Sequence, residues 1–266
     1  MGESAVLKTG ICGLCEGVGI IKKSHLLPKS AYKYLRDLDF DGGSSPLRVD
    51  MAMARFGKTD KQVCAYFLCG ACEGRFSRFG ESLVSKIWAG RSKFLMHDIL
   101  SDINPQFISA DRLLYSADQI SEEISSSLYY FAVSVLWRAV EWPQRLTGVS
   151  QCKTVVSDVL LKVLAGFLIG SVDRLDDVFV VVDVNSNSEL NDFISFPTPT
   201  VHKDCKAVQF DILGLRFIMF LGPDLPSEIQ RIRAEYHKSL VLSCSDHLQS
   251  KNVKMIARFF NEHNVK

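Results

Sequence analysis

The chain has 266 residues, of which 47% are hydrophobic and 23% charged, and its formal net charge is +1. This composition is that of a folded protein with a substantial core, and it argues against a disordered or fibrous chain. The apolar runs 128–137 and 163–169 are shorter than the about 20 residues of a membrane helix, and residues 1–8 lack a signal peptide's apolar core. We therefore expect a cytoplasmic protein with no membrane partner.

The first third of the chain predicts a small unit built around turns. Residues 11–22 indicate a hairpin-like turn, and residues 29–38 place apolar side chains at helical spacing. Residues 39–46 are rich in Asp, Gly and Ser and indicate a loop. Residues 63–68 favour a strand, and from Glu73 onward apolar residues recur as in an amphipathic helix.

The rest of the chain predicts longer elements. We expect a helix over 117–142, begun near Ser121 and stopped by Pro143, and a second over 150–168 that ends near Gly170. A strand over 178–184, a loop or edge at 197–199 and a hairpin over 207–220 follow, and helices over 227–240 and 246–261 close the chain. The predicted fold class is α+β, with one unit over residues 1–95 and a larger α+β unit over residues 96–266. The second unit would serve oligomerisation, substrate restriction or contact with a regulatory protein.

Charge is distributed unevenly between these two units. Residues 1–95 contain 15 Lys+Arg and 9 Asp+Glu, a formal charge of +6, whereas the remaining residues contain 16 and 21, a charge of −5. Between Lys22 and Arg36 there are five basic residues and no acidic one. A basic face of this kind suits a polyanion such as DNA or RNA. The alternative is an ordinary solvated face.

Two cysteine pairs are the most informative motifs. Cys12 and Cys15 are separated by two residues, as are Cys69 and Cys72. This gap allows both thiolates of a tight turn to bind one tetrahedral zinc ion, and a four-thiolate site usually has no open position. We therefore predict a structural zinc ion that links the two segments. The alternative is four buried free cysteines.

His25 is the candidate for chemistry, in the string Ser24-His25-Leu26-Leu27-Pro28-Lys29. A histidine titrates near neutral pH and can take a proton from water. Hydrolysis of a phosphodiester needs such a base together with a divalent cation. The other five histidines are scattered without partners, and a lone histidine is more often structural, so both interpretations of His25 remain open.

The cysteine pairs with the intervening histidine string, followed by Leu68-Cys69-x-x-Cys72-Glu73, resemble the zinc-stapled HNH endonucleases. The chain is most similar to a bacterial HNH-like subgroup with "SHIIPK" and "LCxxCE" strings, and its residues 134–138 (Ser-Val-Leu-Trp-Arg) are similar to a later string of that subgroup. The resemblance covers roughly the first third of the chain. It implies a ββα-metal fold, in which a hairpin and a helix surround one nuclease ion.

The resemblance also assigns roles to single residues. It makes His25 the general base and places Glu73 where the family has a metal-binding histidine. On the predicted helix Glu81 lies about two turns further on and roughly 80° around the axis from Glu73; it would join the ion if the helix lies across the site, and the alternative is a solvated or structural glutamate. The ion would be Mg²⁺ or Mn²⁺. The chain departs from the family at Ser24, which replaces an acidic metal ligand, and in lacking a clear counterpart of the middle asparagine. Phosphates of DNA, with RNA not excluded, would contact the basic residues Lys22, Lys23, Lys29, Lys33, Arg36, Arg75 and Arg78.

The leading hypothesis is a metal-dependent, HNH-like DNA endonuclease, for which antiviral defence is a biological setting suggested by analogy with HNH effectors. The main alternative is a zinc-dependent module that binds nucleic acid or protein and has lost catalysis. A third interpretation makes the α+β half the functional core and the zinc module a scaffold.

Overall fold

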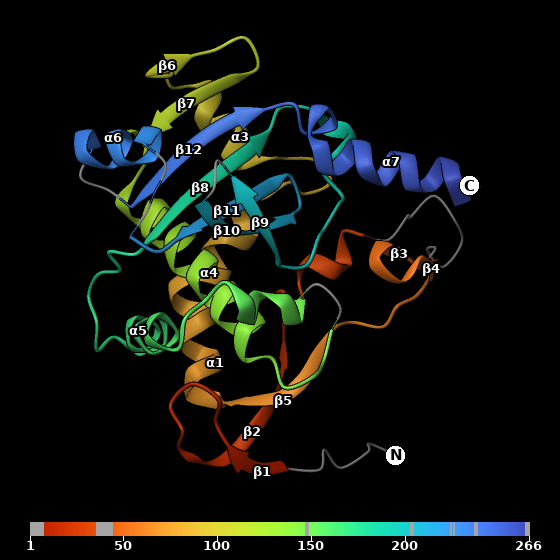
Figure 1. Cartoon of the computed structure of the whole chain (residues 1–266), viewed down its shortest axis with the longest axis vertical. Helices are drawn as coiled ribbons and strands as arrows, with labels where there is room; N and C mark the ends of the chain where they lie inside the picture. Colours follow the sequence, from red (N-terminus) through yellow and green to blue (C-terminus); the bar gives the residue numbers. More distant parts are fainter. Residues whose placement is uncertain are drawn as a thin grey trace.

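The computed structural model describes residues 8–35, 45–146, 149–202, 205–223, 225, 227–236 and 239–263. A small sheet and a large sheet lie at opposite ends of the molecule, with the helices α1 (Gly70–Phe76) and α4 (Glu122–Glu141) between them (Figure 1). The result is a mixed α+β fold. In the described part of the chain, no helix is both long enough and apolar enough to cross a bilayer.

The small sheet has three antiparallel strands in the order β1-β2-β5. The hairpin of β1 (Lys8–Ile11) and β2 (Val18–His25) turns through the first cysteine pair, and β2 then pairs with β5 (Cys64–Cys69). Helix α1 begins at the residue after β5, so the second cysteine pair spans a strand end and the first helical turn. Because β5 runs directly into α1, the side chains on the first turn of α1 have fixed positions relative to the strand.

Helix α1 continues through a π-helical turn, η3 (Ser77–Glu81), into α2 (Ser82–Ile87). The turn packs closely against α4. A Cβ atom on Gly80 would lie 3.1 Å from Cα of Phe131, which is tighter than ordinary van der Waals contact. A glycine is therefore needed where these two helices meet.

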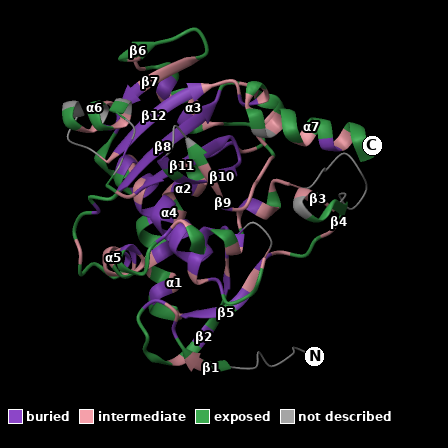
Figure 2. Cartoon of the chain, in the orientation of Figure 1, coloured by how far each residue is buried: buried purple, intermediate pink, exposed green. Residues whose placement is uncertain are grey.

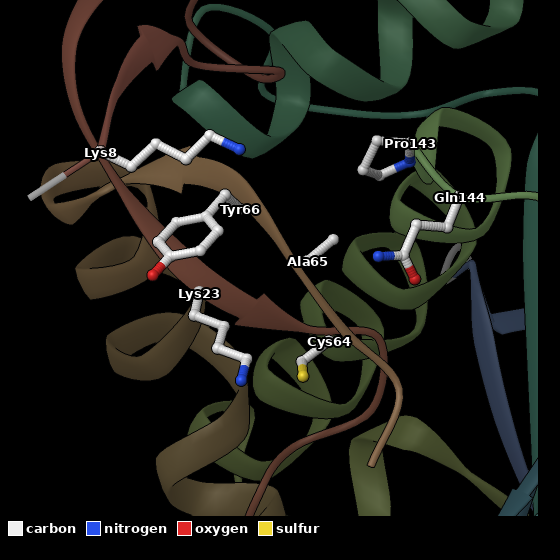
Figure 3. A pocket seen from close by; sticks show the side chains of 7 residues that line it. All are labelled: Lys8, Lys23, Cys64, Ala65, Tyr66, Pro143 and Gln144. Atoms are coloured by element: carbon white, nitrogen blue, oxygen red, sulfur yellow. The ribbon is translucent and has the colours of Figure 1, made fainter. Parts of the chain in front are cut away.

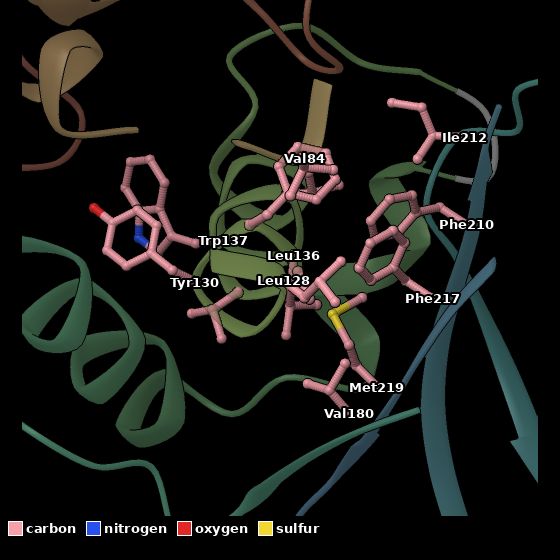
Figure 4. Packing of buried hydrophobic residues seen from close by; sticks show 14 of the residues in the cluster. Val84, Leu128, Tyr130, Leu136, Trp137, Val180, Phe210, Ile212, Phe217 and Met219 are labelled. Carbon is pink, nitrogen blue, oxygen red and sulfur yellow. The ribbon is translucent and has the colours of Figure 1, made fainter. Parts of the chain in front are cut away.

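Helix α4 is the centre of the fold. Every residue from Phe131 to Val140 is buried, so this stretch is enclosed on all sides (Figure 2). On one side Trp137 stacks on Phe67 of the small sheet, with ring centroids 5.4 Å apart. On the other, Phe131 packs against Phe217 of the large sheet at 5.4 Å, so one cluster of buried side chains includes residues of both sheets. Figure 4 shows the part of this cluster between α4 and the large sheet.

The large sheet has seven strands in the order β6-β7-β12-β8-β11-β10-β9, all antiparallel except the parallel pair β12–β8. Strand β8 is buried along its whole length (Figure 2), as expected of a strand covered on both faces. The strands are β6 (Phe107–Ile108), β7 (Arg112–Ser116), β8 (Val178–Asn185), β9 (Thr198–His202), β10 (Cys205–Ile212), β11 (Leu215–Leu221) and β12 (Leu240–Ser245).

The remaining elements are short or peripheral. A two-stranded ribbon of β3 (Leu47–Asp50) and β4 (Arg55–Lys58) forms part of the connection between β2 and β5. The other α-helices are α3 (Leu95–Ser101), α5 (Asp158–Ile169), α6 (Ser227–Tyr236) and α7 (Lys251–His263). The 3-10 turns are η1 (Ala31–Lys33), η2 (Met51–Met53), η4 (Ala117–Gln119), η5 (Val149–Thr154), η6 (Ser188–Leu190) and η7 (His247–Gln249).

Several predicted elements are confirmed. The strand predicted over 63–68 is β5, the strand over 178–184 is β8, and the hairpin over 207–220 turns at Leu213–Gly214 as expected. Ser121 caps α4 through its side chain, and Gly170, at φ 82°, ends α5. The segment 197–199 leads into β9, which is an edge strand.

Other predicted boundaries are wrong. Residues 31–33 form only a 3-10 turn within the helix predicted over 29–38, whose end lies outside the described residues. The helix predicted over 150–168 is interrupted, because Ser157 caps a separate helix from Asp158. The helix predicted over 227–240 ends at Tyr236, and Leu240 begins β12, whose apolar side chains pair with β8. Pairing with a distant strand overrides local helical spacing here.

Strand β8 carries a buried charge, Asp183, at the centre of a polar network. The hydroxyl groups of Ser243 and Ser245 donate to its two carboxylate oxygens, each at 2.6 Å, and Nε2 of His247 lies 3.3 Å from Oδ2. Burial favours the protonated acid, but His247, Arg112 and Ser243 together lower the pKa of Asp183 to about 2. The network joins β8, β12 and η7.

We expect Asp183→Asn to reduce the free energy of unfolding at pH 7 by about 2 kcal/mol, because the pKa of Asp183 rises to its usual value on unfolding. This contribution is present above the unfolded-state pKa and is lost as the pH falls from about 4 to about 2. Urea unfolding of both proteins between pH 7 and pH 2 measures it. The exposed Asp102→Asn is the control; equal acid sensitivity of wild type and Asp183→Asn would contradict the assignment.

Candidate metal centre and active site

The four cysteines of the two pairs come together at the turn of the β1–β2 hairpin and the start of α1. Their sulfur atoms all lie within 4.8 Å of one another, and Sγ of Cys15 is 3.9 Å from Sγ of Cys69. Tetrahedral zinc with Zn–S bonds of 2.3 Å requires sulfur atoms about 3.8 Å apart. The cluster is therefore compatible with a structural zinc ion. It is also the only group of three or more His, Cys, Asp or Glu ligands that the described residues form.

The surroundings of the cysteines distinguish the thiols. Burial opposes ionisation of Cys12, but backbone N–H groups of Cys15, Cys69 and Leu14 lower its pKa to about 7. The N–H of Cys69 donates to Sγ of Cys12 at 3.3 Å. Burial and the neighbouring thiols raise the pKa of Cys72. A buried thiol of this kind ionises readily only with a cation beside it, as a metal-bound thiol does.

His25 is the last residue of β2, and its ring is held by Gln62, which precedes β5. Nε2 of His25 lies 2.9 Å from Oε1 of Gln62. Because a carbonyl oxygen only accepts, this contact assigns the ring proton to Nε2, and in a neutral ring Nδ1 is then the unprotonated nitrogen. Burial lowers the pKa of His25, with Lys29 and Lys23 acting in the same direction and Gln62 and Glu81 opposing it. The imidazole is therefore neutral at physiological pH, the form that can accept a proton.

Arg138 of α4 connects His25 to the helix after β5. The side chain is 2% exposed. Its Nη1 donates to the carbonyl oxygen of His25 at 2.8 Å, and its Nη2 lies 2.8 Å from Oε1 of Glu81. Further bonds go to Ser134 of its own helix, and the guanidinium lies over the ring of Phe76. Arg138 thus holds the backbone of the candidate base and one candidate metal ligand at once.

Glu73, on the first turn of α1, is the second carboxylate of this region. Burial raises its pKa, while the Ser24 hydroxyl and the charge of Arg138 act against the rise and Glu81 adds to it. Its Oε1 is buried and has no hydrogen-bond partner among the described residues. An unpartnered buried carboxylate oxygen is costly, and a cation is the partner that such an oxygen accepts best.

The π-helical turn η3 changes the relation between Glu73 and Glu81. In a regular α-helix these residues would be about 80° apart around the axis. One extra residue in the turn reduces the angle to about 20°, because eight residues then span the rotation of seven. Both carboxylates consequently interact with Arg138.

The basic residues predicted to contact phosphates are not equivalent. Lys22, Lys23, Lys29, Lys33 and Arg78 are exposed, and Lys23 and Lys29 lie near enough to His25 to lower its pKa. Arg75 instead donates to the carbonyl oxygens of Leu168 and Ile169 at the end of α5, at 3.2 and 2.5 Å. Its guanidinium therefore stabilises a helix end. Arg36 lies outside the described residues.

An open cavity of about 390 Å³ lies along β5 beside His25. Lys8 and Lys23 contribute its charge, and Tyr66 contributes an aromatic ring, with Nζ of Lys8 4.9 Å from the ring centre (Figure 3). The cavity extends to Cys64, which pairs with His25 across the two strands. Pro143 and Gln144, after α4, form its opposite wall.

Gln62, Arg138 and Tyr66 were not predicted as site residues. Nothing in the local sequence marks Gln62, because its role depends on the pairing of β2 with β5. Arg138 does have a signal, since it is a single charge within an otherwise apolar stretch of helix, and such a residue is rarely buried without partners.

Comparison with known proteins adds no relative: no family model, no curated protein and no solved structure matches this chain. The residues of the site provide a four-cysteine cluster compatible with zinc, together with a neutral histidine and two carboxylates around a buried arginine.

We expect the purified protein to contain about one zinc ion per chain and Cys69→Ser to contain none, because loss of one thiolate breaks the tetrahedral set. Elemental analysis with thermal unfolding measures both, and chelation should lower the melting temperature of the wild type alone. Cys64→Ser is the control, since Cys64 lies outside the cluster. If removal of zinc by the chelator leaves the melting temperature of the wild type unchanged, the result contradicts a structural zinc site.

We expect Arg138→Met to reduce the free energy of unfolding by about 3 kcal/mol, because it leaves the Glu81 carboxylate and the His25 carbonyl without their donor. Adding Glu81→Gln should restore part of the loss, since the unpaired charge is then removed. Urea unfolding of the single and double variants gives the coupling. A loss below about 1 kcal/mol in Arg138→Met would show that the bridge does not hold the fold together.

Proposed function

We propose that this protein is a metal-dependent, HNH-like DNA endonuclease in which His25 is the general base. The observation that carries the proposal is the tethering of His25: Gln62 fixes its tautomer, Arg138 fixes its backbone, and burial keeps the imidazole neutral. A histidine with a purely structural role has no need of a free Nδ1 on a ring that lies close enough to the Glu81 carboxylate to interact with its charge. The arrangement of β2, β5 and α1 also has the strand–strand–helix order expected of a ββα-metal nuclease.

In the proposed reaction, Nδ1 of His25 accepts a proton from water as the water oxygen attacks phosphorus. The bond from phosphorus to one ester oxygen then breaks, and that oxygen leaves as a hydroxyl group once protonated, so one phosphodiester and one water give a phosphate monoester and an alcohol. Gln62 keeps the proton-accepting nitrogen free by holding the proton on Nε2. The backbone bond from Arg138 prevents the strand end from moving away.

Glu73 and Glu81 are the residues that would hold a divalent ion, Mg²⁺ or Mn²⁺. The unpartnered buried oxygen of Glu73 fits a hard cation, and Arg138 limits the negative charge that the pair would otherwise build up. Such an ion, when bound, supplies the positive charge that stabilises the phosphorane and the departing oxygen. Ser24 accepts from the N–H of Leu68 at 3.2 Å, so it supports β5 in place of the family's acidic ligand.

DNA, with RNA not excluded, is the substrate that the charge supports best. Lys8 and Lys23 line the cavity along β5, and Lys23 and Lys29 lie close enough to His25 to lower its pKa, so phosphates on either side of the scissile bond would meet these charges. Tyr66 offers a ring on which a base can stack. These contacts are made to the phosphate backbone of the nucleic acid and to the face of a base, so we expect the isolated chain to have weak sequence specificity.

The zinc-stapled turn would act as a scaffold that keeps β2 and α1 in register, and it takes no part in the chemistry. A nuclease of this type would need restraint in the cytoplasm of its host. The unit after residue 95 is the proposed place for contact with a second copy or a regulatory protein, and antiviral defence is the proposed setting.

One observation favours the alternative function, a zinc-dependent binding module without catalysis. Oε1 of Glu81 is already engaged by Arg138, and Ser24 contributes no charge, so the candidate ion has fewer free carboxylate oxygens than in a site with three acids. A binding module would keep the basic cavity and the zinc ion and lack cleavage.

We expect wild-type protein to nick plasmid DNA with Mg²⁺ or Mn²⁺, and His25→Ala to lose at least about 100-fold in rate because the general base is missing. The rate should fall less in Gln62→Ala, since the base is still present and only its hydrogen bond to Gln62 is removed. His263→Ala, in an exposed helix far from the site in sequence, is the control and should cleave normally. Cleavage that survives in His25→Ala would reject the assignment, and absence of cleavage in all variants with intact DNA binding would favour the binding module.

The pH dependence follows from the lowered pKa of His25. Because the base must be unprotonated, the single-turnover rate should rise with pH and level off, with its midpoint below the usual value of about 6.5 for histidine. Single-turnover rates between pH 5 and pH 8 give the midpoint. The midpoint should move toward the usual value in Lys29→Ala, which removes a charge that lowers the pKa, and further below it in Gln62→Ala, which removes a hydrogen bond that raises the pKa. A rate that falls with rising pH would contradict a histidine base.

A further inference from the structure

A second basic cavity, of about 620 Å³, lies at the end of α2 and is separate in its lining residues from the cavity beside His25. We call it the basic pocket. Four cations and two aromatic residues define it: Lys33, Lys86, Arg91, Lys93, Tyr34 and Trp88. Its lining includes no acidic residue, and no described carboxylate forms an ion pair with any of the four cations. Like charges gathered around one hollow repel one another unless an anion joins them.

The turn that carries two of these cations is held in place. The N–H of Gly90 donates to the carbonyl oxygen of Lys93 at 2.8 Å, which closes the turn around Arg91. Ala89 forms a β-bridge to Phe94 across the same turn, and its N–H donates at 2.8 Å to the carbonyl oxygen of Leu213 in the large sheet's hairpin. The backbone under Arg91 and Lys93 is therefore fixed before any ligand arrives, which lowers the entropic cost of binding.

The aromatic pair gives the pocket a rigid wall. The rings of Tyr34 and Trp88 meet edge to face, with centroids 6.3 Å apart. Trp88 is 2% exposed, and its indole N–H has no acceptor among the described residues. An unpartnered buried donor beside four cations indicates a need for acceptor oxygens, which water or an anion's oxygen would supply.

We propose that the basic pocket binds the phosphate groups of a nucleotide ligand, supplied either by a nucleic-acid strand or by a free nucleotide. Arg91 offers a planar fork that matches two phosphate oxygens, and the three lysines add point charges around it. Tyr34, which is only partly buried, is the ring of this pair on which a nucleobase can stack. The inference does not depend on catalysis at His25, because binding here is measurable in a protein that cannot cleave.

The test uses full-length His25→Ala protein, so that no substrate is consumed. Binding of a fluorescein-labelled 12-nucleotide single strand is measured by anisotropy between 50 and 200 mM salt, and binding of inorganic tripolyphosphate by calorimetry. The pocket variant is Arg91→Glu/Lys93→Glu. The matched control is Lys153→Glu/Lys162→Glu, which changes the net charge equally at exposed positions outside the pocket. Lys86→Glu is a second pocket variant in case the turn fails to fold.

We expect the pocket variants to weaken one or both probes at least tenfold and the control to weaken neither by more than about twofold. Loss of strand binding, with the slope of log K against log salt concentration smaller by up to about 1.4, identifies the ligand as the backbone of a nucleic-acid strand. Loss of tripolyphosphate binding alone identifies a free nucleotide. The proposal is overturned if neither probe binds, or if the control loses as much as the pocket variants. A basic pocket that binds neither probe would leave plasmid cleavage by the wild type unaffected. This result is therefore distinguishable from absence of nuclease activity.

Discussion

The buried guanidinium of Arg138 is the interaction on which the arrangement of the candidate site depends. Burying a charge costs free energy unless its donors are satisfied, and here they are satisfied by three separate parts of the chain: the end of β2 at His25, the π-helical turn at Glu81, and Ser134 of its own helix. None of these parts can shift without leaving a donor unpaired. The separation between the candidate base and the carboxylates is therefore a property of the core and not of a loop.

The small sheet is fastened to the same helix by a second contact, the stacking of Phe67 on Trp137, the residue before Arg138. The cysteine cluster lies at the same end of the strand pair, where β5 becomes α1, and the carbonyl oxygen of Phe67 accepts from the N–H of Gly13 in the first cysteine turn at 3.0 Å. The strand pair is thus fixed at this end by the thiolates and Phe67, and at its other end, at His25, by Arg138 of α4. Such a frame fixes the backbone of His25, whose ring is half-buried, and a reactive group carried by rigid elements keeps its position.

Sequence reasoning found the parts of this site whose signal is local. The two-residue cysteine spacing and the proline-bounded His25 string are short patterns, and the four cysteines do come together. It did not find Gln62, because only the register of β2 against β5 brings that side chain to His25. The relation of Glu73 to Glu81 was also misjudged, since the π-helical turn adds a residue that no periodicity reveals. In the second half, the sequence predicts no strand over 240–245, where β12 lies, because the pairing of β12 with β8 is set by residues about sixty positions away.

The most direct test of this account is the protonation state of His25, read by nitrogen NMR of histidine-labelled protein at pH 7, with His25→Asn used to assign the signal. The account predicts a neutral ring protonated on Nε2, and a mixture of tautomers in Gln62→Ala. A ring protonated on Nδ1, or one fully charged at pH 7, would contradict it, because neither leaves the nitrogen that the proposed reaction needs.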